Sequence, residues 1–331
     1  MLVCLCAQGA FAADAAGTLK LSHSVTLPGY TGDFDHFAAD LPGGRLFLAA
    51  EDHGTVEVFD LKTGEHTRTL RGFETPHSVF IMPKQNRILV TDGGKGLSKI
   101  IRADNYAVIG TVKTTPGADS IGFDRASGRL YIVTGGKDVN MDTSALAIVD
   151  PSTGQHLGDI EFKSRHVEAM AIEQSGPRLF INITDQGKIA VVDRATRAIT
   201  ATWPVQTCGE NSPMALDEAN RRLFVVCRKP AMLVVFDTDT GKSIASLPAP
   251  ARADDVAFDS VHHRIYVPGG EGYIGVYREK TPNAYELTEK VPSAPGAKTC
   301  LLVPELNRLY VAVSPGDTKN EAKILTYDVR N

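Results

Sequence analysis

The chain has 331 residues, of which 43% are hydrophobic and 22% are charged, a balance that excludes a disordered chain and a coiled coil. The net charge of −4 argues against a non-specific binder of nucleic acid, which needs a basic surface. The 30 Gly and 18 Pro residues indicate many turns, as an all-β fold requires.

The N-terminus differs in composition from the rest of the chain. Residues 1–12, MLVCLCAQGAFA, are apolar and end in Ala10-Phe11-Ala12, a pattern typical of a signal-peptidase site. The sequence therefore predicts a signal peptide over residues 1–12 and an exported single domain over residues 13–331. The alternative is a frayed apolar N-terminus, because the stretch is short and has no Lys or Arg before its apolar run. The sequence contains no run of about 18 apolar residues, so it predicts no transmembrane helix.

Seven repeats follow along the chain. In each, a basic residue precedes Leu or Ile and usually an aromatic residue, with the basic residues at Arg45, Arg87, Arg129, Arg178, Arg222, Arg264 and Arg308. Successive spacings of 42, 42, 49, 44, 42 and 44 residues match the period of a four-stranded propeller blade. Runs such as LFLAA and LFVV predict strands, since they lack helical periodicity. The recurring Arg is expected to be structural, for example by pairing with an acid of the turn between the first and second strands of its blade.

Each repeat also contains an apolar strand ending in Asp and a turn, as in VEVFDLKTG, and a short apolar strand that begins about ten residues before the Arg. Each blade therefore has four antiparallel strands, named a to d from the axis outward. The chain ends in KILTYDVRN, a c strand with no d strand after it, while LKLSHSVTLPG precedes the first repeat as an unpaired d strand. We predict an all-β, seven-bladed propeller whose ring is closed by the N-terminal strand joining the last blade.

This pattern, Arg-Leu-aromatic followed by V-x-V-x-D-x-x-T-G, resembles the YVTN β-propeller repeat family, which includes the YncE-like periplasmic proteins. The resemblance covers residues 19–331, although the string Tyr-Val-Thr-Asn itself does not occur and Tyr131-Ile132-Val133-Thr134 comes nearest. It implies a seven-bladed propeller in the bacterial envelope, periplasmic or secreted. It implies no single activity, because members of such a fold differ in function.

Polar residues recur where each a strand begins, beside the mouth of the central channel. Ten residues before each repeat Arg stand Asp35, His77, Asp119, Glu168, Ser212, Asp254 and Lys298. The next position adds His36 and Asp255. We expect the charged members and the histidines of both positions to bind a ligand: Asp35, His36, His77, Asp119, Glu168, Asp254, Asp255 and Lys298.

Three kinds of site remain open. The mouth is a hydrated polar channel in which Lys298 balances the acids, a pocket for a small polar ligand, or a metal site. In the last case His77 or His36 would hold a divalent ion such as Zn²⁺ or Mn²⁺ with Asp119, Glu168 and Asp254, because mixed imidazole and carboxylate donors suit these ions. The ion would polarise a carbonyl group, and His77 or Glu168 would be the general base.

Two further features have alternatives of their own. In a long b–c loop, Asp138, Asn140 and Asp142 resemble the first half of a Ca²⁺-binding loop, but Thr143 replaces the Gly that the turn needs, so a solvated polar loop is the alternative. Cys208 and Cys227 are 19 residues apart and are candidates for a disulfide in an oxidising compartment, while Cys300 is predicted to be a buried thiol.

Two functions are compatible with these observations. The first is an exported binding or scaffold module, expected to be monomeric, that holds an unidentified small ligand or envelope protein at the channel mouth and its loops. The alternative is a metal-assisted lactonase, other hydrolase or lyase, by analogy with the gluconolactonase-like proteins and virginiamycin B lyase, which place a divalent ion at this mouth. Whether the protein is an enzyme stays open, and a divalent metal is the one candidate cofactor.

Overall fold

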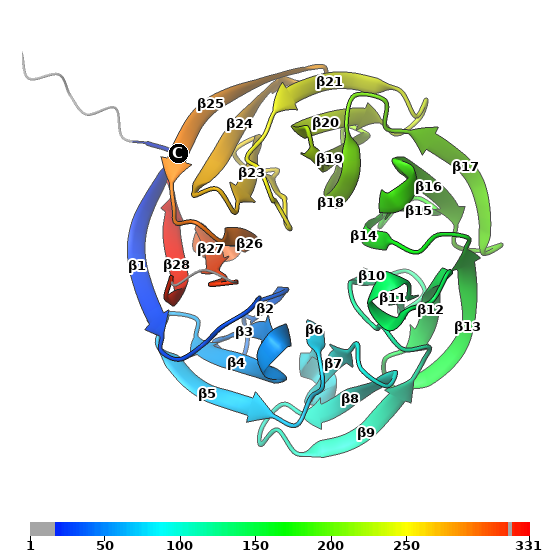
Figure 1. The fold of residues 1–331 in the computed structure, drawn as a ribbon, viewed down its shortest axis with the longest axis vertical. Coiled ribbons are helices and arrows are strands. Elements are labelled where there is room, and N and C mark those ends of the chain that lie inside the picture. Colours follow the sequence, from blue (N-terminus) through cyan, green and yellow to red (C-terminus); the bar gives the residue numbers. More distant parts are fainter. Residues whose placement is uncertain (1–16, 317–319) are drawn as a thin grey trace, which may run out of the picture.

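The computed structural model describes residues 17–316 and 320–331, so the signal peptide expected at residues 1–12 lies outside the described residues. In the described part, 28 strands form seven four-stranded antiparallel sheets, which are arranged as blades around a central axis (Figure 1). The predicted all-β, seven-bladed propeller is therefore confirmed.

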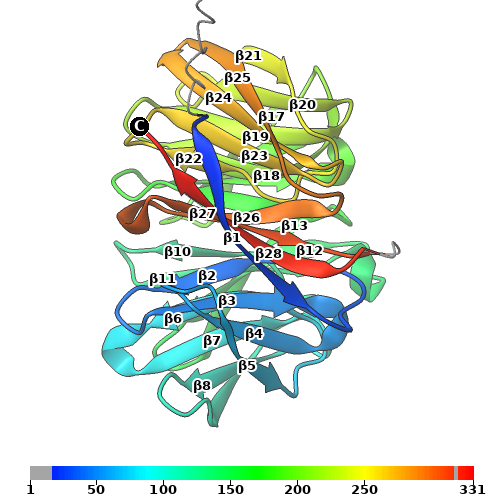
Figure 2. The same ribbon diagram turned by 90° about the vertical axis from the view of Figure 1, so that its left-hand side faces the viewer.

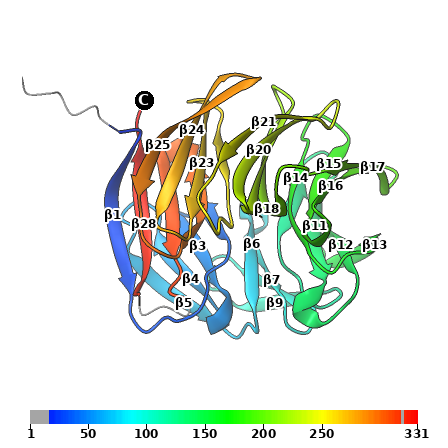
Figure 3. The ribbon, with the colours of Figure 1, turned by 45° about the horizontal axis from the view of Figure 1, so that its top comes forward.

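Six blades consist of four consecutive strands, which follow one another from the axis outward. They are β2 (Phe37–Asp40), β3 (Arg45–Ala50), β4 (Thr55–Asp60) and β5 (His66–Arg71) in blade 1; β6 (Pro76–Met82), β7 (Arg87–Asp92), β8 (Leu97–Arg102) and β9 (Val108–Lys113) in blade 2; β10 (Ile121–Asp124), β11 (Arg129–Gly135), β12 (Ser144–Asp150) and β13 (Gln155–Phe162) in blade 3; β14 (Val167–Ile172), β15 (Arg178–Ile183), β16 (Lys188–Asp193) and β17 (Ala198–Pro204) in blade 4; β18 (Gly209–Asp217), β19 (Arg222–Lys229), β20 (Ala231–Asp237) and β21 (Ser243–Pro248) in blade 5; and β22 (Ala257–Asp259), β23 (Arg264–Gly269), β24 (Tyr273–Thr281) and β25 (Ala284–Pro292) in blade 6. The first strand of each of these blades lies nearest the axis (Figure 1), and Figure 3 shows the same ring of blades obliquely.

The seventh blade joins the two ends of the chain. Its first three strands are β26 (Ala297–Val303), β27 (Arg308–Val313) and β28 (Ala322–Val329), and its outer strand is β1 (Leu19–Leu27). β1 runs antiparallel along β28 over its whole length (Figure 2). This closure confirms the prediction from the unpaired strand at each end of the chain, and it pairs β28, which would otherwise be an open edge.

Short 3-10 helices occupy connections between strands: η1 (Glu51–His53), η3 (Lys137–Val139) and η4 (Thr184–Gln186) lie between b and c strands, and η2 (Pro83–Gln85) and η5 (Pro304–Leu306) between a and b strands. Across the part of the chain that the structure describes, no helix has the length and apolar character needed to cross a membrane.

The hydrophobic core is divided among the contacts between neighbouring blades. Leu46 packs in the cluster between blades 7 and 1, whereas the adjacent Phe47 packs in the cluster between blades 1 and 2. Successive side chains of a strand point to opposite faces of its sheet, and both faces of a blade are covered by neighbours. This arrangement explains why the b strands are continuous apolar runs rather than alternating ones.

In blades 1, 3 and 5 the turn between the c and d strands contains an Asp and a Gly. In blade 1, Asp60 Oδ1 accepts hydrogen bonds from the backbone N–H groups of Lys62 and Thr63 at 2.9 and 2.7 Å. Gly64 then adopts φ = 75°, a conformation that glycine adopts without steric cost. The strand register shifts between Val58 and Phe59, as a bulge next to this turn requires.

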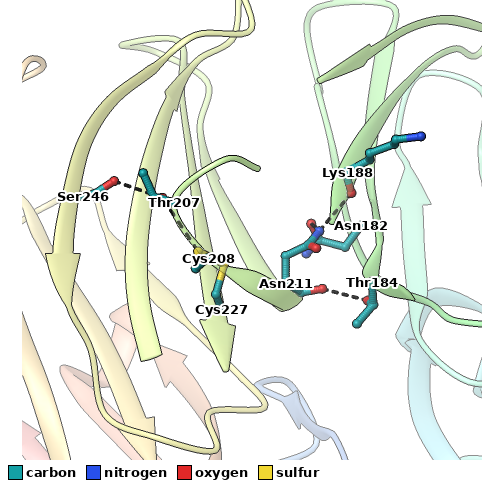
Figure 4. The surroundings of a disulfide bond; sticks show 8 residues. All are labelled: Asn182, Thr184, Lys188, Thr207, Cys208, Asn211, Cys227 and Ser246. Carbon is teal, nitrogen blue, oxygen red and sulfur yellow. Dashed lines mark hydrogen bonds between the residues drawn. A yellow bond between two sulfur atoms is a disulfide. The ribbon is translucent and has the colours of Figure 1, made fainter. Parts of the chain in front are cut away.

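A disulfide links Cys208 and Cys227 in blade 5, with their Cα atoms 6.0 Å apart (Figure 4). Beside it, Asn211 Nδ2 donates to Asn182 Oδ1 at 2.6 Å, and Thr184 Oγ1 donates to the Asn211 carbonyl at 2.7 Å. These bonds join the first strand of blade 5 to blade 4. The disulfide therefore stabilises the segment that holds two blades together.

Candidate functional site

An axial cavity of about 470 Å³ opens on the face that carries the d–a and b–c loops. Six of the seven residues that stand ten positions before a repeat Arg line it: Asp35, His77, Asp119, Glu168, Asp254 and Lys298. The seventh, Ser212, is buried and does not line the cavity; its backbone carbonyl accepts a hydrogen bond from Asn182. The repeat register thus brings together the residues that it predicts.

Five of the seven residues at the next register position line a second cavity: His36, Ser78, Ser120, Ala169 and Asp255. This lower cavity of about 410 Å³ is also lined by apolar side chains such as Met214 and Phe258, and His36 borders both cavities. His36 lies 3.4 Å from Asp255 and 3.3 Å from Ser120 Oγ. His36 is therefore shared by the two cavities, whereas Asp255 lines the lower cavity and not the axial one.

On the side formed by blades 1 to 3, three carboxylates surround one imidazole nitrogen. His77 Nδ1 lies 2.6 Å from Asp35, 3.3 Å from Glu51 and 3.8 Å from Asp119. Asp35 and Asp119 stand just before the a strands of blades 1 and 3, while Glu51 is the first residue of the b–c loop of blade 1. We call these three acids together with His77 the carboxylate cluster.

Burial and neighbouring charges shift the pKa values in this cluster. Burial disfavours the ionised form of Glu51 and, with Asp35 close by, raises the pKa of Glu51 to about 8. Burial also raises the pKa of Asp119 to about 6, although His77 opposes this shift. For His77, burial is outweighed by Asp119, Asp35 and Glu51, which raise its pKa to about 10. The imidazole is therefore cationic at neutral pH, while Glu51 stays protonated.

The pKa values of Asp35 and His36 move in the directions that pairing favours. Burial raises the pKa of Asp35, but His36 and His77 outweigh burial and leave it below its usual value. Burial likewise lowers the pKa of His36, yet Asp35 and Asp255 bring it well above its usual range. Asp35 is thus the carboxylate that both histidines keep ionised.

The acids on the opposite side of the cavity have cationic partners. Glu168 bonds to His166, and Asp254 pairs with Arg228 and with Lys298, whose Nζ lies 2.6 Å from it. Burial opposes ionisation of Glu168, but His166 outweighs burial and leaves the pKa of Glu168 below its usual value. Of the four metal donors considered from sequence, His77 and Asp119 lie in the carboxylate cluster, whereas Glu168 and Asp254 lie in ion pairs elsewhere.

Sequence reasoning missed three of these residues. Glu51 and Arg228 both stand six positions after a repeat Arg, where the b strand ends, and His166 stands twelve positions before one. The sequence does contain a signal for Glu51 and Arg228. Their register position is Gly in blades 2, 3 and 6, so a charged residue there is a departure from the repeat. Uncharged residues at the same positions, such as Gly93 and Thr75, line the axial cavity as well, but they bring no charge to it.

Two groups of donor atoms are compact enough to hold a metal ion. The members of the first, Asp35, Glu51 and His77, lie within 4.8 Å of one another, as do those of the second, Asp35, His36 and Asp119. The blade-3 loop is arranged differently: Asp138 lines the axial cavity, while Asp142 is exposed and lies 3.4 Å from Arg165. The alternating residues of that loop therefore point to different surroundings.

The fold and the site define the class of this protein: an all-β, seven-bladed propeller with a charged axial cavity. Two known proteins are similar to it in sequence. The chain is 27% identical over 210 residues to "Uncharacterized protein YncE" of Salmonella typhimurium and 26% identical to the protein of the same description from Salmonella typhi. The matched region is 62% of this chain and 57% of each relative. No protein-family model matches the chain.

A likeness of fold extends further than that of sequence. A chain of the structure "Crystal Structure of Mitotic Checkpoint Complex" matches with a TM-score of 0.75 and 14% identity, covering 100% of this chain and 98% of the other. At that identity the likeness shows the fold alone. The protein is thus a seven-bladed β-propeller whose sequence is similar, over 210 residues, to those of the two YncE proteins.

Proposed function

We propose that this protein is an exported binding module that holds a small polar ligand in the axial cavity. The observation that carries the proposal is the convergence of charged side chains from all seven blades on one space of about 470 Å³. Concave sites with a few convergent polar groups are the usual form of small-molecule sites. Acids prevail beside blades 1 to 3, and Lys298 and Arg228 lie on the other side, so a ligand that carries both an amine and a carboxylate fits best.

Calorimetric titration with a panel of amino acids, polyamines and dicarboxylates tests this proposal. Lys298→Met removes a lining cation and is expected to weaken binding at least tenfold. Lys84→Met removes a cation from an exposed a–b turn and is the matched control, which should bind as the wild type does. Saturable binding that both variants retain equally would place the ligand elsewhere and overturn the proposal.

Export is the second part of the proposal. It is supported by the Cys208–Cys227 disulfide, because such bonds persist in oxidising compartments, and by the signal peptide expected at residues 1–12. Fractionation of cells that express the full chain should recover it from the periplasm or medium, with a mature N-terminus near Ala13 by mass spectrometry. Recovery of the full-length chain with both thiols reduced in the cytoplasm would contradict export.

A specific observation favours a metal-assisted hydrolase or lyase as a second candidate. The two compact donor groups of the carboxylate cluster contain an imidazole and carboxylates, the donors of many catalytic metal sites. In this candidate a bound ion would polarise a carbonyl group of the substrate. Hydrolysis of a lactone panel that stops on chelation and returns with metal would support it. A protein that binds metal but turns over none of the panel would leave the binding module as the function.

A further inference from the structure

The carboxylate cluster holds more acidic groups than its hydrogen bonds satisfy. The proton on His77 Nδ1 makes one good hydrogen bond, to Asp35 at 2.6 Å. Glu51 at 3.3 Å and Asp119 at 3.8 Å are left with long contacts to the same nitrogen. Within residues 17–316 and 320–331, the Glu51 carboxyl group makes no other hydrogen bond or ion pair. The Nδ1 proton of His77 therefore serves Asp35, while Glu51 is left without a good hydrogen-bond partner.

The donor atoms of Asp35, Glu51 and His77 are close enough together for one ion. Ligands of a tetrahedral ion bound at about 2.0–2.1 Å lie about 3.4 Å apart. His77 Nδ1 lies 3.3 Å from Glu51, which matches that spacing, and all three donor atoms lie within 4.8 Å of one another. His77 Nδ1 and Asp35 are 2.6 Å apart, a hydrogen bond that has to lengthen when an ion replaces the proton.

A neighbouring glycine fixes the direction of the imidazole. A Cβ atom at Gly93 would lie 2.8 Å from His77 Nε2, so no larger residue leaves room for the ring in this position. In this position the ring presents Nδ1 to the three carboxylates. The arrangement therefore depends on two residues, His77 and the glycine that follows β7.

We infer that Asp35, Glu51 and His77 form a site for one divalent metal ion, with a fourth position open to the axial cavity. One imidazole and two carboxylates favour Zn²⁺ or Mn²⁺ over Mg²⁺ and Ca²⁺, which prefer oxygen donors alone. Binding displaces the protons of His77 Nδ1 and of the Glu51 carboxyl group to solvent, and the ion takes their place among the donor atoms. The inference rests on the proposed function, because the three metal ligands line the same axial cavity that is proposed to hold the organic ligand.

Calorimetry of chelator-treated full-length protein with Zn²⁺ and with Mn²⁺ tests the site. We expect one ion per chain, proton release that varies with buffer, and at least tenfold weaker binding for Glu51→Gln. Glu271→Gln is the matched control, since Glu271 stands in the b–c loop of blade 6 on the same face but does not line the cavity. Binding of the ion by Glu51→Gln with unchanged affinity would overturn the inference, as would stoichiometric binding lost equally in both variants.

Thermal unfolding separates loss of the site from loss of the fold. Without metal, Glu51→Gln should melt at or above the wild-type temperature, because it removes one of three crowded carboxylates. With Zn²⁺, the wild type should gain several degrees and Glu51→Gln none. No gain for the wild type would overturn the metal site but not the binding module, which the organic ligands test without metal. Binding of an organic amine in competition with Zn²⁺ would support both.

Discussion

At the residue scale, the position of each titratable side chain depends on what lies beside it in a neighbouring blade. His77 and Asp35 belong to adjacent blades, yet they make the shortest contact of the carboxylate cluster. The repeat register predicts that both face the channel mouth. It does not predict Glu51, whose register position is glycine in three other blades. Contacts between blades depend on rotamers and loop shape, which a repeat pattern does not specify.

A substitution at Gly93 tests whether the metal site depends on the position of the His77 ring, because it leaves all the donor groups in the chain. Gly93→Ala places a methyl group 2.8 Å from His77 Nε2 and should turn the ring away from the carboxylates. We expect Zn²⁺ to bind at least tenfold more weakly while the fold remains. Gly110→Ala is the control in the same blade, because a Cβ atom there meets Ile100 at 3.9 Å, an ordinary van der Waals distance. Equal affinities in calorimetry would show that the ring is not held by Gly93.

Glu168 gives the protein a distinct dependence on pH. Its folded-state pKa lies below the usual value, since His166 outweighs burial, so the ionised form stabilises the fold. This contribution is present above about pH 4.5 and is lost as the pH falls through the lowered folded-state pKa. Glu168→Gln should therefore cost about 1–3 kcal/mol at pH 7 and much less below about pH 4. Thermal unfolding from pH 3 to 8 measures the difference, and a constant difference would contradict this origin.

At the element scale, the repeat Arg residues connect blades as well as turns. Arg45 and Arg178 pair with Asp40 and Glu173, acids at the ends of a strands, as the sequence predicts for a structural Arg. Six of the seven also donate to a backbone carbonyl beyond the c strand of the next blade around the ring, at Ala103, Ser152, Thr238, Pro282, Arg330 and Leu61. The sequence does not reveal these bonds, because they join residues about 60 positions apart or across the ring closure.

Comparing two of these residues tests the bonds between blades. Arg222 is largely buried and donates to the Pro282 carbonyl at 2.6 Å and to Asn283 at 2.7 Å. Arg222→Ala should lower the free energy of unfolding by about 2–3 kcal/mol. Arg129 pairs with Asp150 of its own blade and is over a third exposed, so Arg129→Ala should cost less than about 1 kcal/mol. Denaturant unfolding that gives equal losses would assign the effect to the pairs within a blade.

The disulfide is a device of blade 5 whose effect on stability can be isolated. It closes a loop of 19 residues that contains the hairpin between β18 and β19. Replacing both cysteines by Ser should lower the stability by about 3 kcal/mol, because the unfolded chain regains the freedom that the loop removed. Cys300→Ser provides the comparison for a buried thiol outside the disulfide. Wild type under reducing conditions should melt with the double variant, and unfolding that does not respond to reductant would contradict the pairing.

At the scale of the whole molecule, the fold follows from repetition more directly than the site does. Each repeat encodes the same four strands and the same contact between blades. A wrong interpretation of one residue therefore does not change the predicted architecture. The regular spacing of the repeats and the unpaired strand at each end therefore predict both the number of blades and the closure. The axial cavity is where the repeats differ from one another, and its chemistry depends on single residues of different blades. Repetition consequently carries little information about what the cavity binds.

Closure by β1 makes the stability of the ring depend on its first described strand. Leu27 of β1 packs between blades 7 and 1, and Leu19 packs between blades 6 and 7. A chain that begins at residue 17 should unfold cooperatively, as the full chain does. A chain that begins at residue 29 exposes the edge of β28 and should self-associate or lose its sharp transition. Adding a peptide of residues 17–28 should restore a monomer by light scattering and return the melting temperature toward that of the longer chain. A shorter chain that stays monomeric with an unchanged melting temperature would show that blades 1 to 6 hold the ring without this closure.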